Sequence, residues 1–467
     1  MSEPTPVKPL PHLRFLDTVL YTIVMTVGLR WLPVAAAVGP ASLPLWVLAF
    51  VTFFIPLAVA TTELTAQYPG EGGIYTWVVD SYGPLAGFVC SWFYWVSLLP
   101  YFAGIVYFIS GVILTAFGVA GKDATLYLSL SITLACFVTA FQFAGLRGNK
   151  WLTNFGAAGS WVIFFALIAL AVVLLVRGET AGNFHNASWL PKANFSSAIL
   201  WGTVIFAFCG VESVAFLRDE IKGGVRTIAR VLAAVGLSQT LIYGVGTAAM
   251  LLLLPTAALT RLTGLPDAVR AAFDHAGYGA FAVVAIGLLG LSQLGGFTAW
   301  FGIGTRLTLA AASDGSLPKI FARRHPVTGA PGPAIILLGT LTLLMVFISQ
   351  AGAGAAAAYD FLVSMSVLTV VIPYVFMFAA YLKRVPVARA PGVWVAPGGV
   401  GLRRLIGYVG LVSTLIAIAC TLVPDSGDAH PLTTFLKIVL SALAAAAVGL
   451  FFYWAGRHRR SIAPALP

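Results

Sequence analysis

The sequence predicts an all-α integral membrane protein with twelve transmembrane helices. Three observations support this fold class: 59% of the 467 residues are hydrophobic, only 9% are charged, and the apolar residues form long continuous runs. A soluble domain carries about 25% charged residues, and a helix needs about 20 mostly apolar residues to cross a bilayer. Continuous runs favour a helical bundle over an outer-membrane barrel, whose strands alternate apolar and polar residues over about ten positions.

Twelve apolar runs mark the predicted helices in chain order. They cover residues 14–37, 44–66, 86–117, 125–144, 151–176, 198–217, 228–254, 279–311, 333–350, 357–382, 404–423 and 434–455. The segment before the first run is polar and proline-rich. No small-residue cleavage site follows the first run at a distance typical of signal peptides. We therefore expect the first helix to be retained.

The distribution of basic residues predicts the orientation. With the N-terminus inside, 20 of the 27 Lys and Arg residues fall in inner loops and helix ends, and five fall in outer loops. The positive-inside rule then places both termini in the cytoplasm. It also explains the formal net charge of +11 by topology, so we expect no nucleic-acid partner. The excess of Arg over Lys, 19 to 8, and the alanine-rich helices favour a bacterial inner membrane.

The sequence gives little support for catalysis or metal binding. No predicted span carries paired carboxylates, a nucleotide-binding loop or a nucleophile beside a base. The four cysteines lie in predicted spans without metal-ligand spacing, and none of the six histidines is central to a span. We therefore expect no enzyme, no cofactor and no metal site, which leaves transporters, channels and structural scaffolds.

Two predicted spans contain sequences typical of a broken helix. The first span reads TVGLRWLP at residues 26–33, and the sixth reads FAFCGVESVAF at residues 206–216. A break frees backbone groups that lipid cannot satisfy, so such a segment should face a cavity or a ligand. The two spans are five helices apart, which is the offset of two inverted five-helix repeats. Close helix packing is the alternative explanation of each glycine.

Four motifs lie at residues 63–78, 206–213, 219–231 and 294–334. Together they resemble the amino acid-polyamine-organocation (APC) superfamily, in particular its amino acid permeases and antiporters such as the arginine/agmatine and glutamate/GABA exchangers. ELTAQYPGEGGIYTWV at 63–78 resembles the signature Pro-x-x-Gly-Gly-x-Tyr, and FAFCGVES at 206–213 is similar to aromatic-x-Phe-x-Gly-Val-Glu. DEIKGGVRTIARV at 219–231 resembles the segment that follows in the family, with Gly224 and Ala229 in place of two prolines. The stretch 294–334 is similar to the family's eighth span and its Asp-Gly-x-Leu-Pro continuation.

The resemblance implies ten core helices in two inverted repeats, with a substrate site between the first, third, sixth, eighth and tenth spans. The repeats would cover residues 14–177 and 198–382, joined by an outer loop at 178–197. Two additional helices would follow at 383–456, between cytoplasmic tails at 1–13 and 457–467. Spans 1, 2, 6 and 7 would rock against the rest during transport.

The resemblance also implies the residues that bind substrate. Thr26, Val27 and Gly28 stand where family members carry Gly-Ser-Gly, whose backbone amides receive a substrate carboxylate. Phe206 is similar to an aromatic gate, and Phe297 occupies the place of an aromatic residue that lines the pocket. The sixth-span candidates continue from Phe206 through Ala207, Phe208, Cys209 and Gly210.

Arg30 and two carboxylates are candidates for gating or coupling. A cation at the bilayer centre costs roughly 2.5–3.5 kcal/mol, so Arg30 should be buried in protein and water. It could pair with Asp360 as an outer gate, contact a substrate carboxylate, pair with Glu212, or reach the outer interface. Glu212 could carry a coupling proton or bind the amides of the broken helix. Ser160 stands about where some proton-coupled relatives carry a lysine, which leaves sodium coupling, uncoupled exchange and proton coupling through another group open.

The sequence thus predicts a secondary transporter of amino acids that works by alternating access. A polyamine or organic-acid carrier is the alternative on the same fold, and a channel or non-transporting sensor is the alternative of a different class. The expected partners are a small-molecule substrate, membrane lipid, and either a coupling ion (H⁺ or Na⁺) or a counter-substrate. The oligomeric state is left open.

Overall fold

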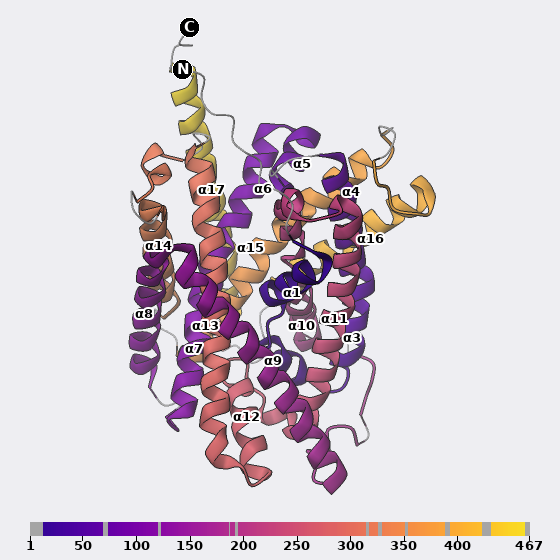
Figure 1. Ribbon diagram of the computed structural model, residues 1–467, viewed down its shortest axis with the longest axis vertical. Helices are drawn as coiled ribbons and strands as arrows, with labels where there is room; N and C mark the ends of the chain where they lie inside the picture. Colours follow the sequence, from indigo (N-terminus) through magenta and orange to yellow (C-terminus); the bar gives the residue numbers. More distant parts are fainter. Residues whose placement is uncertain are drawn as a thin grey trace.

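A computed structural model shows an all-helical protein (Figure 1). It describes residues 13–68, 73–119, 123–185, 187–191, 195–313, 317–325, 329–350, 354–387, 393–422 and 431–462. These residues form no strand, and an isolated parallel bridge joins Leu13 to Ile221. Of the predicted terminal tails, 1–13 and 457–467, residues 1–12 and 463–467 lie outside the described residues, whereas 457–462 continue the last helix.

Ten helical segments of the described chain are long and apolar enough to cross a membrane. The first two are composite, since α3 (Ser42–Ala49) continues through the π-helical Phe50–Phe54 into α4 (Ile55–Gln67), and α6 (Pro84–Val96) is followed by α7 (Leu98–Ala116). The others are or lie within α8 (Ala124–Phe141), α9 (Gly145–Arg177), α11 (Gly224–Leu253), α13 (Gly279–Ser313), α14 (Gly332–Gln350), α15 (Ala355–Arg384), α16 (Gly399–Thr421) and α17 (Pro431–Ile462).

The first and sixth predicted spans are interrupted. α1 (Phe15–Thr26) ends where Val27 turns to extended backbone, with φ −81° and ψ 115°, and α2 (Trp31–Ala36) resumes after Arg30. α10 (Phe195–Ala207) is followed by a 3₁₀ helix, η3 (Val211–Glu220). Gly210 between them has φ +94°, which only glycine adopts at little cost. Because 3₁₀ runs beyond four residues are uncommon, η3 marks an unusual segment.

Two helices lie outside the predicted spans. α12 (Gly264–His275) occupies the lower end of Figure 1, and α5 (Gly73–Tyr82) occupies the upper end. Short 3₁₀ turns complete the chain at Gln142–Ala144, Thr256–Ala258 and Lys319–Ala322.

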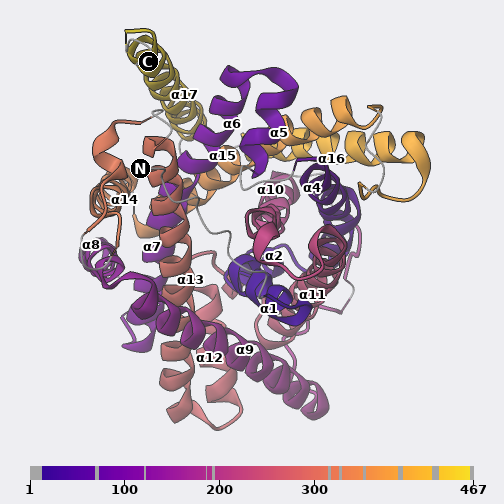
Figure 2. The same cartoon turned by 45° about the horizontal axis from the view of Figure 1, so that its top comes forward.

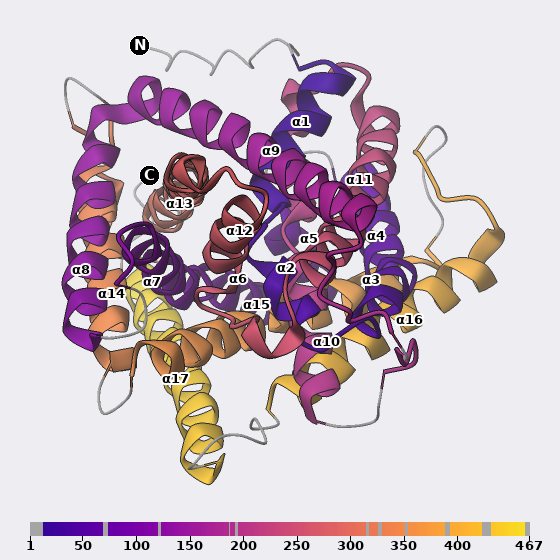
Figure 3. The same cartoon turned by 90° about the horizontal axis from the view of Figure 1, so that it is seen from below.

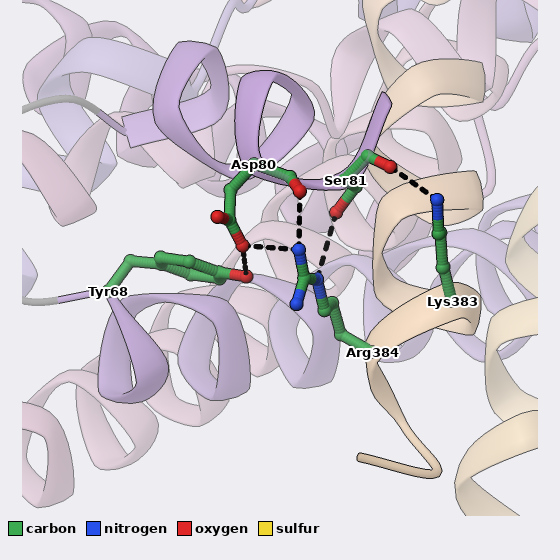
Figure 4. A network of polar contacts seen from close by, with 5 residues as sticks. All are labelled: Tyr68, Asp80, Ser81, Lys383 and Arg384. Atoms are coloured by element: carbon green, nitrogen blue, oxygen red, sulfur yellow. Dashed lines mark hydrogen bonds and ion pairs between the residues drawn. The ribbon is translucent and has the colours of Figure 1, made fainter. Parts of the chain in front are cut away.

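A polar network joins α5 to the end of α15 (Figure 4). Arg384 forms an ion pair with Asp80, and its Nε donates to Ser81 Oγ at 3.3 Å. Lys383 donates to the Ser81 carbonyl oxygen, and Tyr68 at the end of α4 donates to Asp80. The helix after the second span is therefore anchored to the end of the tenth.

The interrupted helices lie inside the bundle. Figure 2 places α1 and α2 near the middle of the molecule, where α11 contacts both and α10 contacts α2. In Figures 2 and 3, α16 and α17 lie at the periphery. α9 packs closely on α13. Glycine at positions 156 and 295 permits this close approach, since a Cβ added to Gly156 would lie only 3.0 Å from the Gly295 Cα. This close approach positions two walls of the site described below.

Glu63, near the end of α4, is a fully buried carboxylate with partners next to α16. Its Oε2 accepts a hydrogen bond from Arg403 Nη1 at 3.3 Å, and its Oε1 accepts one from the Ala396 amide at 3.0 Å. A buried carboxylate needs such partners, and these connect α4 to the start of α16. Glu63 thus has the contacts of a helix-end residue rather than of a substrate site.

Candidate substrate site

A cavity of about 100 Å³ lies between the two helix interruptions. Its wall comes from the break between α1 and α2, the break between α10 and η3, and the facing sides of α6, α7, α9, α13 and α15. The sequence-predicted residues in this wall are Thr26, Val27, Gly28, Arg30, Phe206, Cys209, Gly210 and Glu212. Segments far apart in the chain therefore meet at one cavity, which is large enough for several water molecules.

Four predicted residues do not belong to this wall. Phe208 packs against Trp46 and Tyr243, on the side of α10 away from the cavity. Ala207 is also buried outside the wall. Phe297 is fully buried among other aromatic rings of α7 and α13, at 5.4 Å from the ring centre of Phe102 and 5.9 Å from that of Phe301. Asp360 forms an ion pair with Arg261 at 3.4 Å.

α13 presents a different aromatic residue to the cavity. Its lining positions are Ser292, Gln293, Gly296 and Trp300, which recur at the spacing of one helix face. Trp300 Nε1 also donates to the Met25 carbonyl oxygen at 2.8 Å, which fixes the end of α1. The spacing of small and polar residues along 292–300 is a signal in the sequence that could have identified this face.

Tyr243 of α11 satisfies backbone groups at both breaks. Its hydroxyl accepts a hydrogen bond from the Gly28 amide at 3.2 Å, and lies 3.1 Å from the Ala207 carbonyl oxygen and 3.3 Å from that of Thr26. The hydroxyl has one hydrogen to donate, and the shorter distance favours Ala207. One buried side chain thus replaces the water that the freed groups would otherwise require. The sequence analysis did not identify this residue, because its role depends on contacts between distant segments.

Glu212 is the second group that closes a break. Its Oε2 accepts hydrogen bonds from the Gly210 amide at 3.0 Å and from Tyr374 at 2.8 Å, and its Oε1 accepts one from Tyr94 at 2.9 Å. Three donors directed at two oxygens stabilise an ionised carboxylate. This geometry corresponds to the alternative in which Glu212 binds the amides of the broken helix.

Arg30 lies in the cavity wall and is only 3% exposed. Its Cζ is 4.3 Å from the ring centre of Trp31 and 4.7 Å from that of Tyr101, so two aromatic rings contact the guanidinium. Within the described part of the chain it forms no ion pair with Asp360 or Glu212, and its buried Nη1 has no hydrogen-bond acceptor. Cation–π contacts offset part of the cost of burial, but they leave the N–H donors unpaired.

A polar patch completes the wall between α9 and α13. The hydroxyls of Ser160 and Ser292 form a hydrogen bond, and Gln293 Nε2 donates to Ser292 Oγ at 3.4 Å. No group of three or more His, Cys, Asp or Glu side chains in the described residues is arranged to hold a metal ion. The wall therefore offers hydroxyls, an amide, aromatic rings and one cation to a small molecule, whereas its one carboxylate, Glu212, already accepts hydrogen bonds within the protein.

A family model described as amino acid permease matches residues 13–446. The chain belongs to the amino acid permease family. It is 26% identical over 420 residues to an uncharacterised transporter of Legionella pneumophila, a match that covers 89% of this chain and 90% of that one.

Two further relatives are antiporters of Lactococcus lactis. A probable agmatine/putrescine antiporter is 23% identical over 420 residues, which cover 89% of the permease and 88% of the relative. A glutamate/gamma-aminobutyrate antiporter is 23% identical over 427 residues, which cover 87% and 83% of the two chains. These matches confirm the resemblance to the APC permeases and antiporters. The permease is a membrane transporter, and its family and these relatives are not enzymes.

Tyr374→Phe should destabilise the permease, because it removes a donor from the buried Glu212 carboxylate. We expect a loss of about 1.5–3 kcal/mol, the range for hydrogen bonds to charged groups, seen as a lower midpoint of thermal unfolding in detergent. Tyr359→Phe is the matched control, since the buried Tyr359 hydroxyl has no hydrogen-bond partner among the described residues, and it should leave the midpoint nearly unchanged. Equal midpoints for the two variants would contradict the role assigned to Tyr374.

Proposed function

We propose that the permease is a secondary transporter of amino acids that works by alternating access, with the cavity between the two helix breaks as its substrate site. The observation that carries this proposal is that both breaks, far apart in sequence, open onto the same buried cavity. Interrupted helices near the bilayer midplane supply backbone and side-chain groups for a polar substrate. The family match and the antiporter relatives support the same conclusion.

The proposed topology has twelve spans. In it, α1 with α2 and α10 with η3 each cross the membrane as one interrupted span, in addition to the ten continuous spans. The first ten spans would then form two inverted five-helix repeats, with α16 and α17 outside them. The position of α16 and α17 at the periphery in Figure 2 supports this division.

The proposed movement is a rocking of spans 1, 2, 6 and 7 against the remaining core helices. In the structure, α11 contacts α1, α2, α3 and α4, and α10 contacts α2 and α3. On the other side, α7 contacts α8, α13 and α14. The cavity lies between these two groups, so their relative rotation would open it to one side of the membrane and then to the other.

The proposed substrate class is amino acids, and the alternatives are polyamines or amines and organic acids. A coupling ion, H⁺ or Na⁺, or a counter-substrate would drive transport. A channel or a non-transporting sensor would differ from a carrier in its kinetics, because a carrier must change conformation in every cycle.

Reconstituted permease should exchange amino acids across liposomes. We expect saturable uptake of at least one member of a panel of the twenty radiolabelled amino acids, agmatine and putrescine. Uptake should accelerate when the same unlabelled compound is loaded inside the liposomes. The binding site of an exchanger returns to the outer side faster with substrate bound than when empty. Empty liposomes are the control. Flux that rises linearly with concentration, without acceleration from inside, would indicate a channel, and no flux of any compound would contradict the transport proposal.

The proposed orientation in the cell membrane places both termini in the cytoplasm. Ala258 lies in the turn before α12, toward the start of the long helix α13, and Arg324 lies beyond the end of α13. Both residues are exposed. In intact cells, Ala258→Cys should react with a membrane-impermeant maleimide, whereas Arg324→Cys should react only after permeabilisation. The wild type, whose cysteines lie in transmembrane helices or the cavity wall, gives the background. Reaction of Arg324→Cys in intact cells would reverse the orientation.

Glu212 is the proposed coupling group, because it is the carboxyl of the cavity wall. Protonation would weaken the bonds it accepts from Gly210 and Tyr374, and so would link proton binding to the second break. We expect Glu212→Gln to flatten the dependence of uptake on pH. A folded Glu212→Gln permease whose pH profile matches the wild type would restrict Glu212 to the structural role.

A further inference from the structure

Arg30 is a buried cation that the protein leaves without an acceptor. Its side chain lies in the cavity wall, and the residue is only 3% exposed. Its Nη1 has no hydrogen-bond partner in the part of the chain that the structure describes. A guanidinium has five N–H donors and no acceptor, and leaving buried donors unpaired is costly. Such a group in a cavity wall indicates an anionic ligand.

Glu212 and Asp360, the two carboxylates considered as partners of Arg30, have other partners. Arg30 and Glu212 are the charged residues among those that line the cavity. Both oxygens of Glu212 accept hydrogen bonds from Gly210, Tyr94 and Tyr374, and Asp360 is paired with Arg261. Arg30 would therefore need a carboxylate that arrives with the substrate.

Two backbone amides at the first break already have acceptors within the protein. The Val27 amide donates to the Ile23 carbonyl oxygen at 2.8 Å, and the Gly28 amide donates to the Tyr243 hydroxyl at 3.2 Å. Two amides at this break are therefore already paired within the protein. A carboxylate in the cavity would find its strongest donor in the Arg30 guanidinium, which can bind both of its oxygens.

Aromatic rings pack against this guanidinium. Its Cζ lies 4.3 Å from the ring centre of Trp31 and 4.7 Å from that of Tyr101, and Phe206 packs edge-to-face on Trp31 with ring centres 5.1 Å apart. The rings accept no conventional hydrogen bond, so the guanidinium N–H groups are left for a ligand. The apolar surface of the rings would also exclude water and strengthen a charge-assisted hydrogen bond.

We propose that Arg30 binds the carboxylate of the transported substrate, and that the permease takes amino acids with uncharged side chains and rejects the amines formed by their decarboxylation. Once a carboxylate pairs with Arg30, the lining residues offer no free charged group for a charged side chain. This inference rests on the proposed transport function and assigns the substrate class of the same site. It separates the permease from its relative named as an agmatine/putrescine antiporter.

The test compares molecules that differ only by the carboxylate. The pairs are alanine and ethylamine, leucine and 3-methylbutylamine, and phenylalanine and phenethylamine, with arginine and agmatine as a pair that carries a charged side chain. Binding is measured by the rise in thermal stability of the purified permease, since a ligand of the folded state stabilises it. Competition with exchange in liposomes gives the second measurement. The variants are Arg30→Gln, Arg30→Lys and, as a control, Arg404→Gln, at an exposed position of α16 outside the cavity wall.

We expect at least one uncharged amino acid to bind and compete, and its amine and the arginine pair to have no effect. Arg30→Gln should lower the affinity for that amino acid about 100-fold or more, because the carboxylate loses its buried charge partner. Arg30→Lys should bind more weakly than the wild type but more tightly than Arg30→Gln, and Arg404→Gln should match the wild type. If Arg30→Gln does not fold, two measurements test the inference in its place. They are the comparison of each amino acid with its amine on the wild-type permease, and the affinity of Arg30→Lys.

The opposite results overturn the inference. Exchange of an amine as effectively as its amino acid, or wild-type affinity in folded Arg30→Gln, would remove Arg30 from substrate binding while leaving the transport function intact. Absence of binding and exchange for every compound by folded wild-type protein would overturn the transport function itself, and this inference with it.

Discussion

The structure depends on how backbone groups are satisfied where two helices break inside the bundle. Lipid offers no hydrogen-bond partner, so each freed N–H and C=O must be paired by protein or by bound molecules. Tyr243 serves both breaks with one hydroxyl, and Glu212 with Tyr374 serves the second. Tyr243 comes from α11 and Tyr374 from α15, so the stability of the breaks depends on the packing of these helices around them. The same requirement places polar groups in the wall of a cavity inside an apolar protein.

Arg30 and Glu212 show two solutions to the cost of a buried charge. Glu212 is surrounded by donors, so its charge is compensated inside the protein. Arg30 contacts two aromatic rings, whose attraction amounts to roughly 0.5–2 kcal/mol, and its Nη1 has no hydrogen-bond acceptor among the described residues. A site of this kind is well suited to transport, because the missing partner is supplied only when a substrate arrives. A permanent partner such as Asp360 would remove that dependence, and in the structure Asp360 is paired with Arg261 instead.

Much of the fold could be predicted from hydrophobic periodicity, because membrane helices must be long, apolar and continuous. The predicted run 279–311 corresponds to α13 at Gly279–Ser313, and 357–382 corresponds to α15 at Ala355–Arg384. The short helices α5 and α12 were not predicted, since neither is long enough to cross a membrane. Glycine positions located both breaks, but Tyr243 and Tyr374 could not be identified from local sequence. Their roles arise from contacts with residues more than a hundred positions away. Motif alignment selected Phe297 for the pocket, whereas the face of α13 that lines it carries Trp300.

We expect a substrate carboxylate to occupy the cavity between the breaks and to pair with Arg30. A cryo-electron microscopy structure of the permease, saturated with an amino acid that it exchanges, would locate this carboxylate. Density for the amino acid should lie between Gly28 and Gly210, with the carboxylate oxygens within about 3 Å of the Arg30 guanidinium nitrogens. Density for the amino acid at another site, or in the cavity with its carboxylate away from Arg30, would contradict this expectation.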